Sequence, residues 1–430
     1  MAKEIDLNGP QICAVGVNYT RTPIAIREKL SIPKEHIHDA LASLGNYVPK
    51  GVILATCNRT EVYAIDDDSH SADRAIREFL KARSGLSEDE LAPYLYIHHN
   101  YRAMRRLCKI TSGLYSMILG EHEILGQVSQ ALDDAEKARM VDLPLRRLFQ
   151  EAISTGRRVR HETGISRNAL SISSVAVDLA AKATGNIHDC RVLLIGAGEA
   201  GKLAARALVR RGVPQISVTS RSFQRAQDLA SMLGGTAIES SEKWRDLAAA
   251  DIVISCTGAP HFVLHREQVE QTMHLRPERP LVIIDIAVPR DTEPTVREIE
   301  GVFLYDIDDL NNTLGLNWEE REGEIDKAMA IITSDLEHLL GWWQSLEAKP
   351  TVSALMQMAE NVRQQQLNLT LKKLPPLSQE EQDSLEAMTK SIVNKILHNP
   401  IQCLKENGHK DEDIARIVRE LFALDGQNQK

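Results

Sequence analysis

The sequence predicts a multidomain α/β protein, in which an N-terminal α+β unit of βαβ type precedes a parallel-sheet unit and an all-helical unit. Three observations predict this order. Short apolar runs alternate with helical stretches as far as residue 100, six strand-like runs separated by helix-length segments follow residue 190, and no strand-like run appears after residue 317. We place the three units at residues 1–165, 166–316 and 317–430.

The first unit combines strand-like runs with short helices. The strands are expected at residues 12–18, 52–56, 62–65 and 94–99, and the helices at 24–30, 36–44 and 72–83. A polar stretch at 57–61 separates two apolar runs, which predicts a hairpin or tight bend. From residue 100 to 163 apolar residues recur at helical spacing, so we expect this segment to lie across the sheet as helices.

The second unit begins with a helix over residues 172–183 and then alternates strands with helices. Its strands are expected at 191–195, 216–220, 236–239, 251–257, 280–287 and 301–306. Such alternation is typical of a parallel sheet covered by helices on both faces, and here it predicts a Rossmann fold.

The third unit has the pattern of four amphipathic helices. They are expected over residues 318–343, 352–374, 384–397 and 413–424. We expect Pro350, Pro375, Pro376 and Pro400 to separate them, because proline lacks a backbone donor and disfavours helix at the preceding residue. The unit offers few catalytic groups, and its length suits a dimerisation bundle.

Composition limits the classes of function. Charged residues make up 26% and hydrophobic residues 43%, which is typical of a soluble globular protein. The net charge of −9 means that contact with nucleic acid requires a local basic face. The six cysteines are scattered without a CxxC pair, which argues against a disulfide framework and against a zinc site, so we expect no metal. The sequence has no secretory signal and no long apolar run, and we expect a cytoplasmic protein without membrane contact.

The strand at 191–195 leads into a glycine-rich turn of the form GxGxxG. The turn consists of Gly196, Ala197, Gly198, Glu199, Ala200 and Gly201, and a helix follows it. In this context the glycines permit a tight turn and the close approach of a pyrophosphate, whose charge the helix N-terminus stabilises. A tight turn without a ligand is the alternative interpretation.

The end of the next strand indicates which dinucleotide binds. NAD requires an acidic residue near this point for its ribose 2′-hydroxyl, whereas the sequence has Ser220 and Arg221. Hydroxyl and guanidinium groups suit a 2′-phosphate, so we expect NADPH and hydride transfer. The alternative is that Arg221 is a solvated surface arginine.

Cys57 stands among polar residues at the end of an apolar strand. A buried structural cysteine has apolar neighbours, as Cys256 has, so we expect Cys57 to be exposed and reactive, although burial is the default for a free cysteine. Arg59 is placed to lower the thiol pKa or to bind a substrate carboxylate bidentately. A thiol combined with a nicotinamide suggests attack on an acyl group, a thioester and hydride transfer.

These residues belong to a set of motifs that resemble the glutamyl-tRNA reductase family along nearly the whole chain. The motifs are AVGVN (14–18), ATCNRTEVY (55–63), SGLYSMILGEHEILGQV (112–128), RRVRHETGIS (157–166), GAGEAG (196–201) and DIAVPRD (285–291). The 112–128 segment is long and unusual in composition, which makes the resemblance specific. It implies NADPH-dependent reduction of glutamyl-tRNA(Glu) to glutamate 1-semialdehyde, the first step of tetrapyrrole synthesis by the five-carbon route.

The resemblance also implies roles for individual residues. Cys57 is the implied nucleophile that displaces the tRNA and forms the thioester, and Arg59 grips the carboxylate of the glutamate. The other implied pocket residues are Thr56, Asn58, Ser116, Glu121, His122, Glu123 and Gln127. Without the resemblance, ordinary polarity of a helix surface would explain Glu121 and Gln127.

Four positions depart from the family pattern. Arg106 stands where the family has a histidine for acid–base steps, and Tyr19, Tyr115 and Glu123 replace a histidine, an aspartate and a glutamine. Arginine stays protonated, so Arg106 is expected to stabilise a thiolate or an oxyanion and not to act as a base. His98 or His99 is the alternative source of acid–base function. We expect a divergent but active enzyme.

Partners follow from the resemblance and from charge. Residues 139–167 contain seven arginines against three acidic residues, which suggests a basic stripe for the charged tRNA(Glu), with a solvated helix face as the alternative. The resemblance also implies a homodimer and a transient complex with glutamate-1-semialdehyde aminomutase. Two other functions stay open, namely a generic NADP-dependent dehydrogenase similar to shikimate dehydrogenases, and a non-catalytic tRNA-binding or regulatory homologue.

Overall fold

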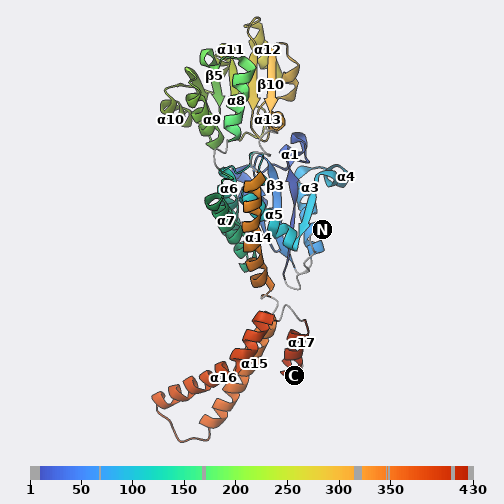
Figure 1. Cartoon of the computed structure of the whole chain (residues 1–430), viewed down its shortest axis with the longest axis vertical. Coiled ribbons are helices and arrows are strands. Elements are labelled where there is room, and N and C mark those ends of the chain that lie inside the picture. Colours follow the sequence, from blue (N-terminus) through green and yellow to red (C-terminus); the bar gives the residue numbers. More distant parts are fainter. Residues whose placement is uncertain are drawn as a thin grey trace. The chain divides into compact units, whose positions relative to one another are not determined.

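The computed structural model describes residues 10–66, 69–166, 171–313, 322–344, 346, 349–407 and 412–424 (Figure 1). The chain divides into two compact units. The larger unit spans Ile12–Asp335, and the smaller combines Leu336–Lys430 with Met1–Gln11. The larger unit holds two separate sheets with their helices, which we call the hairpin module and the Rossmann module.

The hairpin module is built on a four-stranded sheet in the order β2-β3-β1-β4. The strands are β1 (Gln11–Asn18), β2 (Lys50–Ala55), β3 (Arg59–Asp66) and β4 (Tyr96–His99). Strands β2 and β3 are antiparallel, with Ala55 opposite Thr60. The hairpin expected near residues 57–61 is therefore confirmed, and Cys57 lies in its turn.

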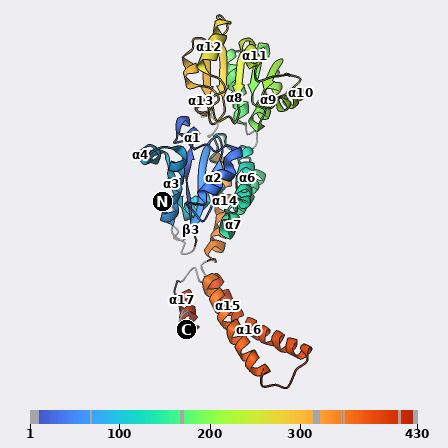
Figure 2. The same ribbon diagram turned by 180° about the vertical axis from the view of Figure 1, so that it is seen from behind.

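Helices α1 to α7 complete this module (Figures 1 and 2). Their bounds are Ile24–Leu30, Ile37–Leu44, Ser69–Ser84, Glu88–Leu91, Asn100–Thr111, Glu123–Lys137 and Leu143–Glu162. Helix α6 packs against β2 and α7, and α5 packs against α7. The helical segment expected from residue 100 to 163 is thus three helices, with residues 112–122 as a loop before α6.

The Rossmann module contains a six-stranded parallel sheet in the order β10-β9-β8-β5-β6-β7. The strands β5 to β10 are Arg191–Ile195, Gln215–Thr219, Thr236–Ile238, Ile252–Ser255, Leu281–Asp285 and Val302–Asp306. The helices α8 to α13 are Ile172–Thr184, Glu199–Arg210, Phe223–Leu233, Lys243–Ala249, Arg266–His274 and Ile307–Thr313.

Both faces of this sheet are buried, as the sequence predicts. Val192 and Leu194 of β5 contribute to one apolar cluster, whereas Leu193 and Ile195 contribute to another. This alternation follows from the two-residue period of a strand. The strand order reverses direction at β5, which is the arrangement of a Rossmann fold, and dinucleotides bind at such a switch point.

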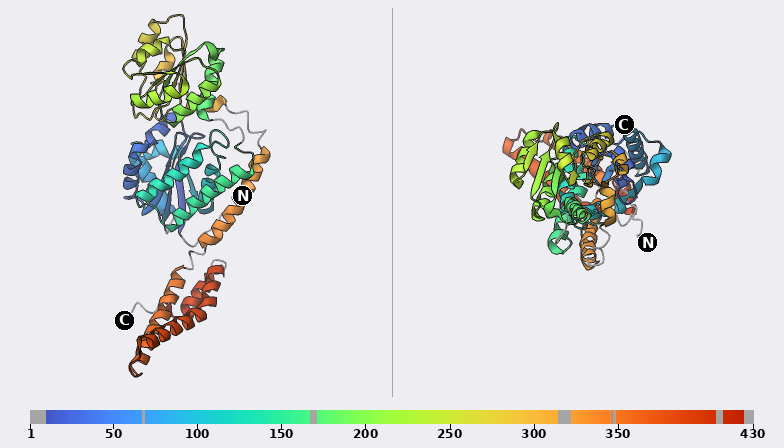
Figure 3. Two further views of the ribbon diagram at one scale, coloured as in Figure 1. Left: turned by 90° about the vertical axis from the view of Figure 1, so that its left-hand side faces the viewer. Right: turned by 90° about the horizontal axis from the view of Figure 1, so that it is seen from above.

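The smaller unit is helical, and four helices form this part of the chain as expected (Figures 1 and 3). Helices α14 to α17 are Glu322–Gln344, Lys349–Leu371, Gln379–Asn407 and Glu412–Leu421, and α14 begins in the larger unit. Helices α15 and α16 pack side by side. No helix among the described residues is long and apolar enough to cross a membrane.

The expected helix break at Pro400 is wrong, because α16 continues through it to Asn407. Ile401 and Leu404 follow the proline and pack with Leu355 in the apolar core of this unit. That packing offsets the backbone hydrogen bond that proline removes. Pro350 lies in the first turn of α15, where a missing donor costs little.

We expect the loop before α6 to require glycine at position 120. The φ of Gly120 is +76°, and a Cβ there would lie 2.1 Å from the backbone oxygen of Ile165. We therefore expect Gly120→Ala to lower the free energy of unfolding by more than about 2 kcal/mol, measured by urea titration.

Gly85→Ala is the matched control. Gly85 has a φ of +67°, but a Cβ there would meet no atom of the described residues within 4 Å. Its cost should be about 1 kcal/mol, which is the backbone contribution alone. Equal losses for the two variants would contradict the steric argument.

Candidate active site

The turn of the β2–β3 hairpin holds Cys57 in a network of backbone and side-chain hydrogen bonds. The Thr56 amide donates to the Arg59 carbonyl at 2.8 Å, and the Asn58 amide donates to Oγ1 of Thr56 at 3.2 Å. The Asn58 carbonyl accepts from the Tyr19 amide at 2.9 Å. Thr56 and Asn58 therefore shape the turn, while Oδ1 of Asn58 is buried and has no partner among the described residues.

Cys57 is half-buried, and the expected exposed, acidic thiol is wrong for this structure. It packs with Ile24, Met117 and Ile307. Burial raises the pKa of its thiol to about 12, the charge of Glu121 raises it further, and nearby guanidinium groups only partly oppose this. The apolar side chains exclude the water that would stabilise a thiolate, so Cys57 is protonated at neutral pH.

A buried ion cluster lies below the turn. Oε1 of Glu61 accepts hydrogen bonds from Arg59 at 2.9 Å and from Arg106 at 3.0 Å, and Oε2 accepts from the Tyr63 hydroxyl at 2.7 Å. Burial alone would raise the pKa of Glu61, but the two guanidinium groups outweigh it and hold that pKa at about 2. Glu61 is therefore ionised throughout the working pH range.

No contact of the described residues joins Arg106 to Cys57, and its expected catalytic role stays a prediction. Its guanidinium is bonded to Glu61 and stacks on Tyr96, 3.8 Å from the ring centroid. Its pKa lies well above the usual value for arginine, since the opposite charge of Glu61 outweighs burial. We therefore assign Arg106 to the support of the ion cluster.

The two histidines considered as substitutes for Arg106 lie on strand β4, as the sequence predicts. Burial, reinforced by the charge of Arg106, lowers the pKa of His98 to about 4. Nε2 of His99 lies 3.3 Å from Oδ2 of Asp73. No described contact places either ring at Cys57.

The 112–122 loop reaches the turn through Met117, which packs with Cys57, through the Tyr115 carbonyl, which accepts from Arg59, and through Glu121. Ser116 is buried, and Glu121 is half-buried close enough to Cys57 to affect its pKa. Burial raises the pKa of Glu121 to about 7, although the Ser116 hydroxyl and the charge of Arg59 lower it. Glu121 is thus partly protonated at neutral pH, next to a protonated thiol.

The remaining predicted pocket residues stand at the start of α6. His122 is exposed, whereas Glu123 and Gln127 are half-buried. The charge of Glu123 raises the pKa of Glu121, which places Glu123 near the pocket. No contact of the described residues joins His122 or Gln127 to the turn.

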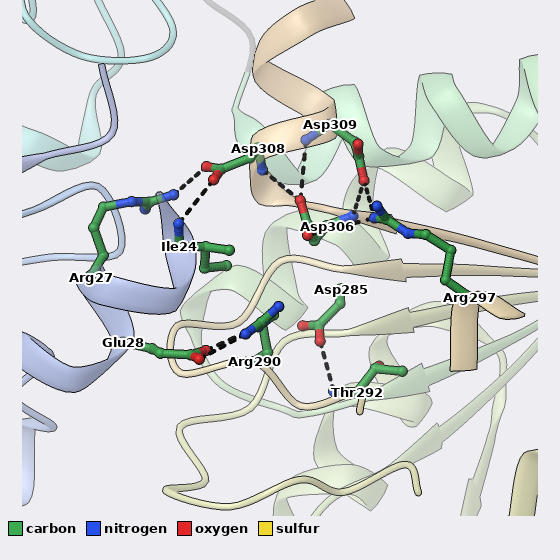
Figure 4. Close-up of polar contacts among 10 residues, drawn as sticks. All are labelled: Ile24, Arg27, Glu28, Asp285, Arg290, Thr292, Arg297, Asp306, Asp308 and Asp309. Carbon is green, nitrogen blue, oxygen red and sulfur yellow. Dashed lines mark hydrogen bonds and ion pairs between the residues drawn. The ribbon is translucent and has the colours of Figure 1, made fainter. Parts of the chain in front are cut away.

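Sequence reasoning missed Arg27 of α1, which is only 3% exposed. Its Nη1 donates to the Cys57 carbonyl at 2.8 Å, its Nε donates to the Thr22 carbonyl at 3.0 Å, and its Nη2 pairs with Asp308 of the Rossmann module (Figure 4). An arginine within the short run IAIREKL gives no pattern that would single it out. Arg27 is nevertheless a cation bonded to the backbone of Cys57.

The glycines of the GxGxxG turn have two different functions. Gly196 has a φ of +115°, and a Cβ on Gly201 would lie 2.2 Å from its oxygen. Gly198 is the N-cap of α9, and a Cβ there would meet no described atom within 4 Å. The first and third glycines therefore allow the backbone to pack, and the second leaves an open cradle at a helix N-terminus, as a bound pyrophosphate requires.

The rest of the expected cofactor site surrounds this cradle. Ala197 is buried, the Ala200 carbonyl accepts from Ser173 at 3.0 Å, and Glu199 pairs with Lys202 at 2.7 Å. Glu199 is thus engaged with its own helix.

Strand β6 supplies the second part of the site. The Thr219 carbonyl accepts from the Gly196 amide at 2.8 Å, and its buried Oγ1 has no partner among the described residues. Ser220 is half-buried and Arg221 is exposed. An orphaned hydroxyl and an exposed cation beside the open cradle fit a phosphorylated dinucleotide.

Three of the seven arginines of the expected basic stripe form ion pairs in the described part of the chain. Arg146 pairs with Glu136, Arg147 with Glu151, and Arg158 with Glu162 and Asp335. Arg160 donates inward to the carbonyls of Thr111 and Glu121, Arg139 and Arg157 are exposed, and Arg167 lies outside the described residues. The ion pairs reduce the positive charge of the expected stripe, and tRNA binding by these arginines stays a prediction.

A cluster of three groups able to bind a metal lies elsewhere in the hairpin module. The ligand atoms of His70, Asp73 and His99 lie within 4.8 Å of one another. Arg77 already pairs with Asp73 at 3.0 Å, and its positive charge opposes a cation there. We assign no metal to this cluster.

The charge of Glu121 should control the reactivity of Cys57. Glu121→Gln removes a negative charge that raises the thiol pKa, so the thiolate fraction should rise at pH 8 and alkylation by iodoacetamide should become several-fold faster. The rate should also keep increasing with pH, because the thiol pKa is about 12. Mass spectrometry of the Cys57 peptide gives the rate.

Glu123→Gln is the matched control for this experiment. Glu123 acts on the pKa of Glu121, which is already mostly ionised at pH 8, so the alkylation rate should stay unchanged. An unaltered rate in Glu121→Gln would show that its carboxylate does not act on the sulfur.

Comparison with known proteins identifies the family. Residues 15–163 match the family model of the glutamyl-tRNA(Glu) reductase N-terminal domain, residues 178–313 that of shikimate/quinate 5-dehydrogenase, and residues 327–424 that of the glutamyl-tRNA(Glu) reductase dimerisation domain. The dehydrogenase match supports a nicotinamide cofactor for the Rossmann module.

Individual relatives cover almost the whole chain. Glutamyl-tRNA reductases of Carboxydothermus hydrogenoformans and Pelotomaculum thermopropionicum are 40% and 42% identical over 97% of this chain and over 94% and 95% of their own. The solved Methanopyrus kandleri enzyme is 34% identical over 96% of this chain and 99% of its own, with a TM-score of 0.48. The chain belongs to the glutamyl-tRNA reductase family.

Proposed function

We propose that this protein reduces glutamyl-tRNA(Glu) to glutamate 1-semialdehyde with NADPH, through a thioester on Cys57. The observation that carries the proposal is the closeness of Cys57 and Glu121 at the β2–β3 turn, in a member of the glutamyl-tRNA reductase family. We propose residues 1–165, 166–316 and 317–430 as the catalytic, NADPH-binding and dimerisation domains.

The first half-reaction is acyl transfer. Sγ of Cys57 attacks the carbonyl carbon of the glutamyl ester, the carbon–sulfur bond forms, and the bond to the ribose oxygen of the tRNA breaks. The thiol proton leaves with that oxygen, so the tRNA departs as a free alcohol. The raised thiol pKa requires proton transfer during the attack, because little thiolate exists beforehand.

Recognition of the glutamate uses the polar groups around the turn. The Glu121 carboxylate suits the α-ammonium group, which would favour its ionised form. The Nε of Arg59 is buried and has no partner among the described residues, whereas its two Nη atoms are bonded to Glu61 and to the Tyr115 carbonyl. A bidentate contact of Arg59 with the substrate carboxylate would therefore require its hydrogen bond to the Tyr115 carbonyl to break. His122, Glu123 and Gln127 remain proposed pocket residues through the family resemblance.

The second half-reaction is reduction of the thioester. When bound, NADPH supplies the hydride that converts the thioester carbonyl to an aldehyde. The carbon–sulfur bond then breaks, and Cys57 takes up a proton and returns as a thiol. The cradle at Gly198 would hold the pyrophosphate, and Ser220 and Arg221 would contact the 2′-phosphate.

The helical unit supports the proposed homodimer. Exposed apolar side chains of α15 and α16 include Val362 (49%), Leu369 (50%), Ile392 (48%) and Ile396 (66%). Apolar surface of this extent is usually covered by a partner, and the match to a dimerisation domain supports a second copy of the chain. A transient complex with glutamate-1-semialdehyde aminomutase is part of the proposal, because it would shelter the reactive aldehyde.

Two rival functions predict different outcomes. A generic NADP-dependent dehydrogenase would turn over without tRNA and would not depend on Cys57. A non-catalytic tRNA-binding homologue would bind tRNA without acquiring glutamate. The retained thiol and the open cradle at Gly198 favour the reductase over the non-catalytic homologue.

Cys57→Ser should abolish both half-reactions. In a single turnover with glutamyl-tRNA labelled in the glutamate, the wild-type protein should acquire label without NADPH and release labelled aldehyde with it, whereas the variant should do neither. Cys403→Ser is the control, because Cys403 is an exposed thiol in the helical unit. Label that persists in Cys57→Ser would exclude Cys57 as the nucleophile.

Arg221→Ala should weaken NADPH binding about tenfold or more and leave NADH binding nearly unchanged, because a charge-assisted hydrogen bond to the 2′-phosphate is lost. Titration of the fluorescence of each reduced nucleotide measures this. Arg210→Ala, at the opposite end of α9, is the control. Equal losses for the two nucleotides would refute contact with the 2′-phosphate.

A further inference from the structure

Helix α1 joins the nucleophile turn to the Rossmann module. Its consecutive residues Arg27 and Glu28 pair with Asp308 and Arg290, which belong to the Rossmann module (Figure 4). We call these four side chains the docking joint. The two pairs have opposite polarity, so each module contributes one cation and one anion.

The contact between Glu28 and Arg290 is bidentate. Nη2 of Arg290 lies 2.7 Å from Oε1 of Glu28, and its Nε lies 3.0 Å from Oε2. The side chains are only 20% and 15% exposed, respectively. A planar guanidinium that donates two hydrogen bonds to one carboxylate fixes both the distance and the relative orientation of the two groups. This pair therefore constrains the packing of the two modules more than a single hydrogen bond would.

Other contacts hold α1 at both of its ends. The Ile24 amide donates to Oδ2 of Asp308 at 3.1 Å, and the Ser31 hydroxyl donates to the Val288 carbonyl at 3.3 Å. Ile24 also packs with Ile307 in the apolar cluster that includes Cys57. The docking joint is therefore surrounded by further hydrogen bonds and by apolar packing.

Arg27 connects this interface to the nucleophile. One guanidinium donates to the Cys57 carbonyl and pairs with Asp308. Because the guanidinium is rigid and planar, a displacement of Asp308 moves the backbone of Cys57 or breaks one of the two contacts.

The Rossmann side of the joint stands where cofactor chemistry takes place. Arg290 follows the carboxyl end of β9, and Asp308 follows that of β10. Dinucleotides lie beyond the carboxyl ends of the strands in this fold. Asp308 is held there because Oδ1 of Asp306 accepts from its amide at 3.0 Å.

We propose that Glu28 and Arg290 are positioning residues for the reduction half-reaction, which act through the docking joint to hold the Cys57 thioester against the nicotinamide end of the cofactor. The inference rests on the proposed function, because it assigns these residues to its second step. Acyl transfer needs only the hairpin module and the tRNA. Reduction needs both modules, held in the correct relative position. Loss of the docking joint should therefore slow reduction and leave acyl transfer unchanged.

The test uses the full-length protein with Glu28→Ala, Arg290→Ala and the double variant. Labelling of Cys57 without NADPH and the affinity for NADPH should both remain at wild-type values. Reduction of the preformed thioester should slow about tenfold or more, since a small misplacement of reacting groups is costly in rate. The double variant should be no slower than either single variant, because both substitutions remove one shared contact.

Arg266→Ala is the matched control. Arg266 pairs with Glu298, and this pair lies wholly within the Rossmann module and includes no residue of the docking joint. The reduction rate of this variant should equal that of the wild type.

Three results would count against these proposals in distinguishable ways. Unchanged reduction in all joint variants would overturn the positioning role. Parallel loss of labelling, NADPH affinity and reduction would also overturn it, since it would indicate a general structural defect. A wild-type protein that never acquires label would instead overturn the proposed thioester chemistry itself.

Discussion

The candidate site depends on one buried carboxylate, Glu61. It neutralises Arg59 and Arg106 in a region that water does not reach. A buried charge that loses its partner typically costs about 3–5 kcal/mol, so the three groups must be kept together. This requirement fixes the first residues of β3, and with them the turn that carries Cys57. Arg106, which stands where a histidine was expected to act, is bonded to the same carboxylate as Arg59.

Local patterns in the sequence predicted most of the fold. The β2–β3 hairpin and the six parallel strands follow from apolar runs, turn residues and helix-length spacers, which are properties of neighbouring residues. Pro400 shows the limit of such patterns. Leu355 lies far away in sequence, and its packing with residues after the proline keeps α16 continuous.

The same limit applies to the candidate site. The turn and the glycine cradle were located from the sequence, but the burial of Cys57 was not. Its covering residues Ile24, Met117 and Ile307 come from three distant segments. Arg27 was missed for the same reason, because its function arises from contacts with Cys57 and Asp308 and not from its neighbours in the chain.

The high thiol pKa of Cys57 bears on how this protein survives oxidative conditions. Peroxides attack thiolates, and a protonated, half-buried sulfur reacts with them slowly. In the proposed thioester mechanism, this shielding preserves the group that each catalytic cycle must expose.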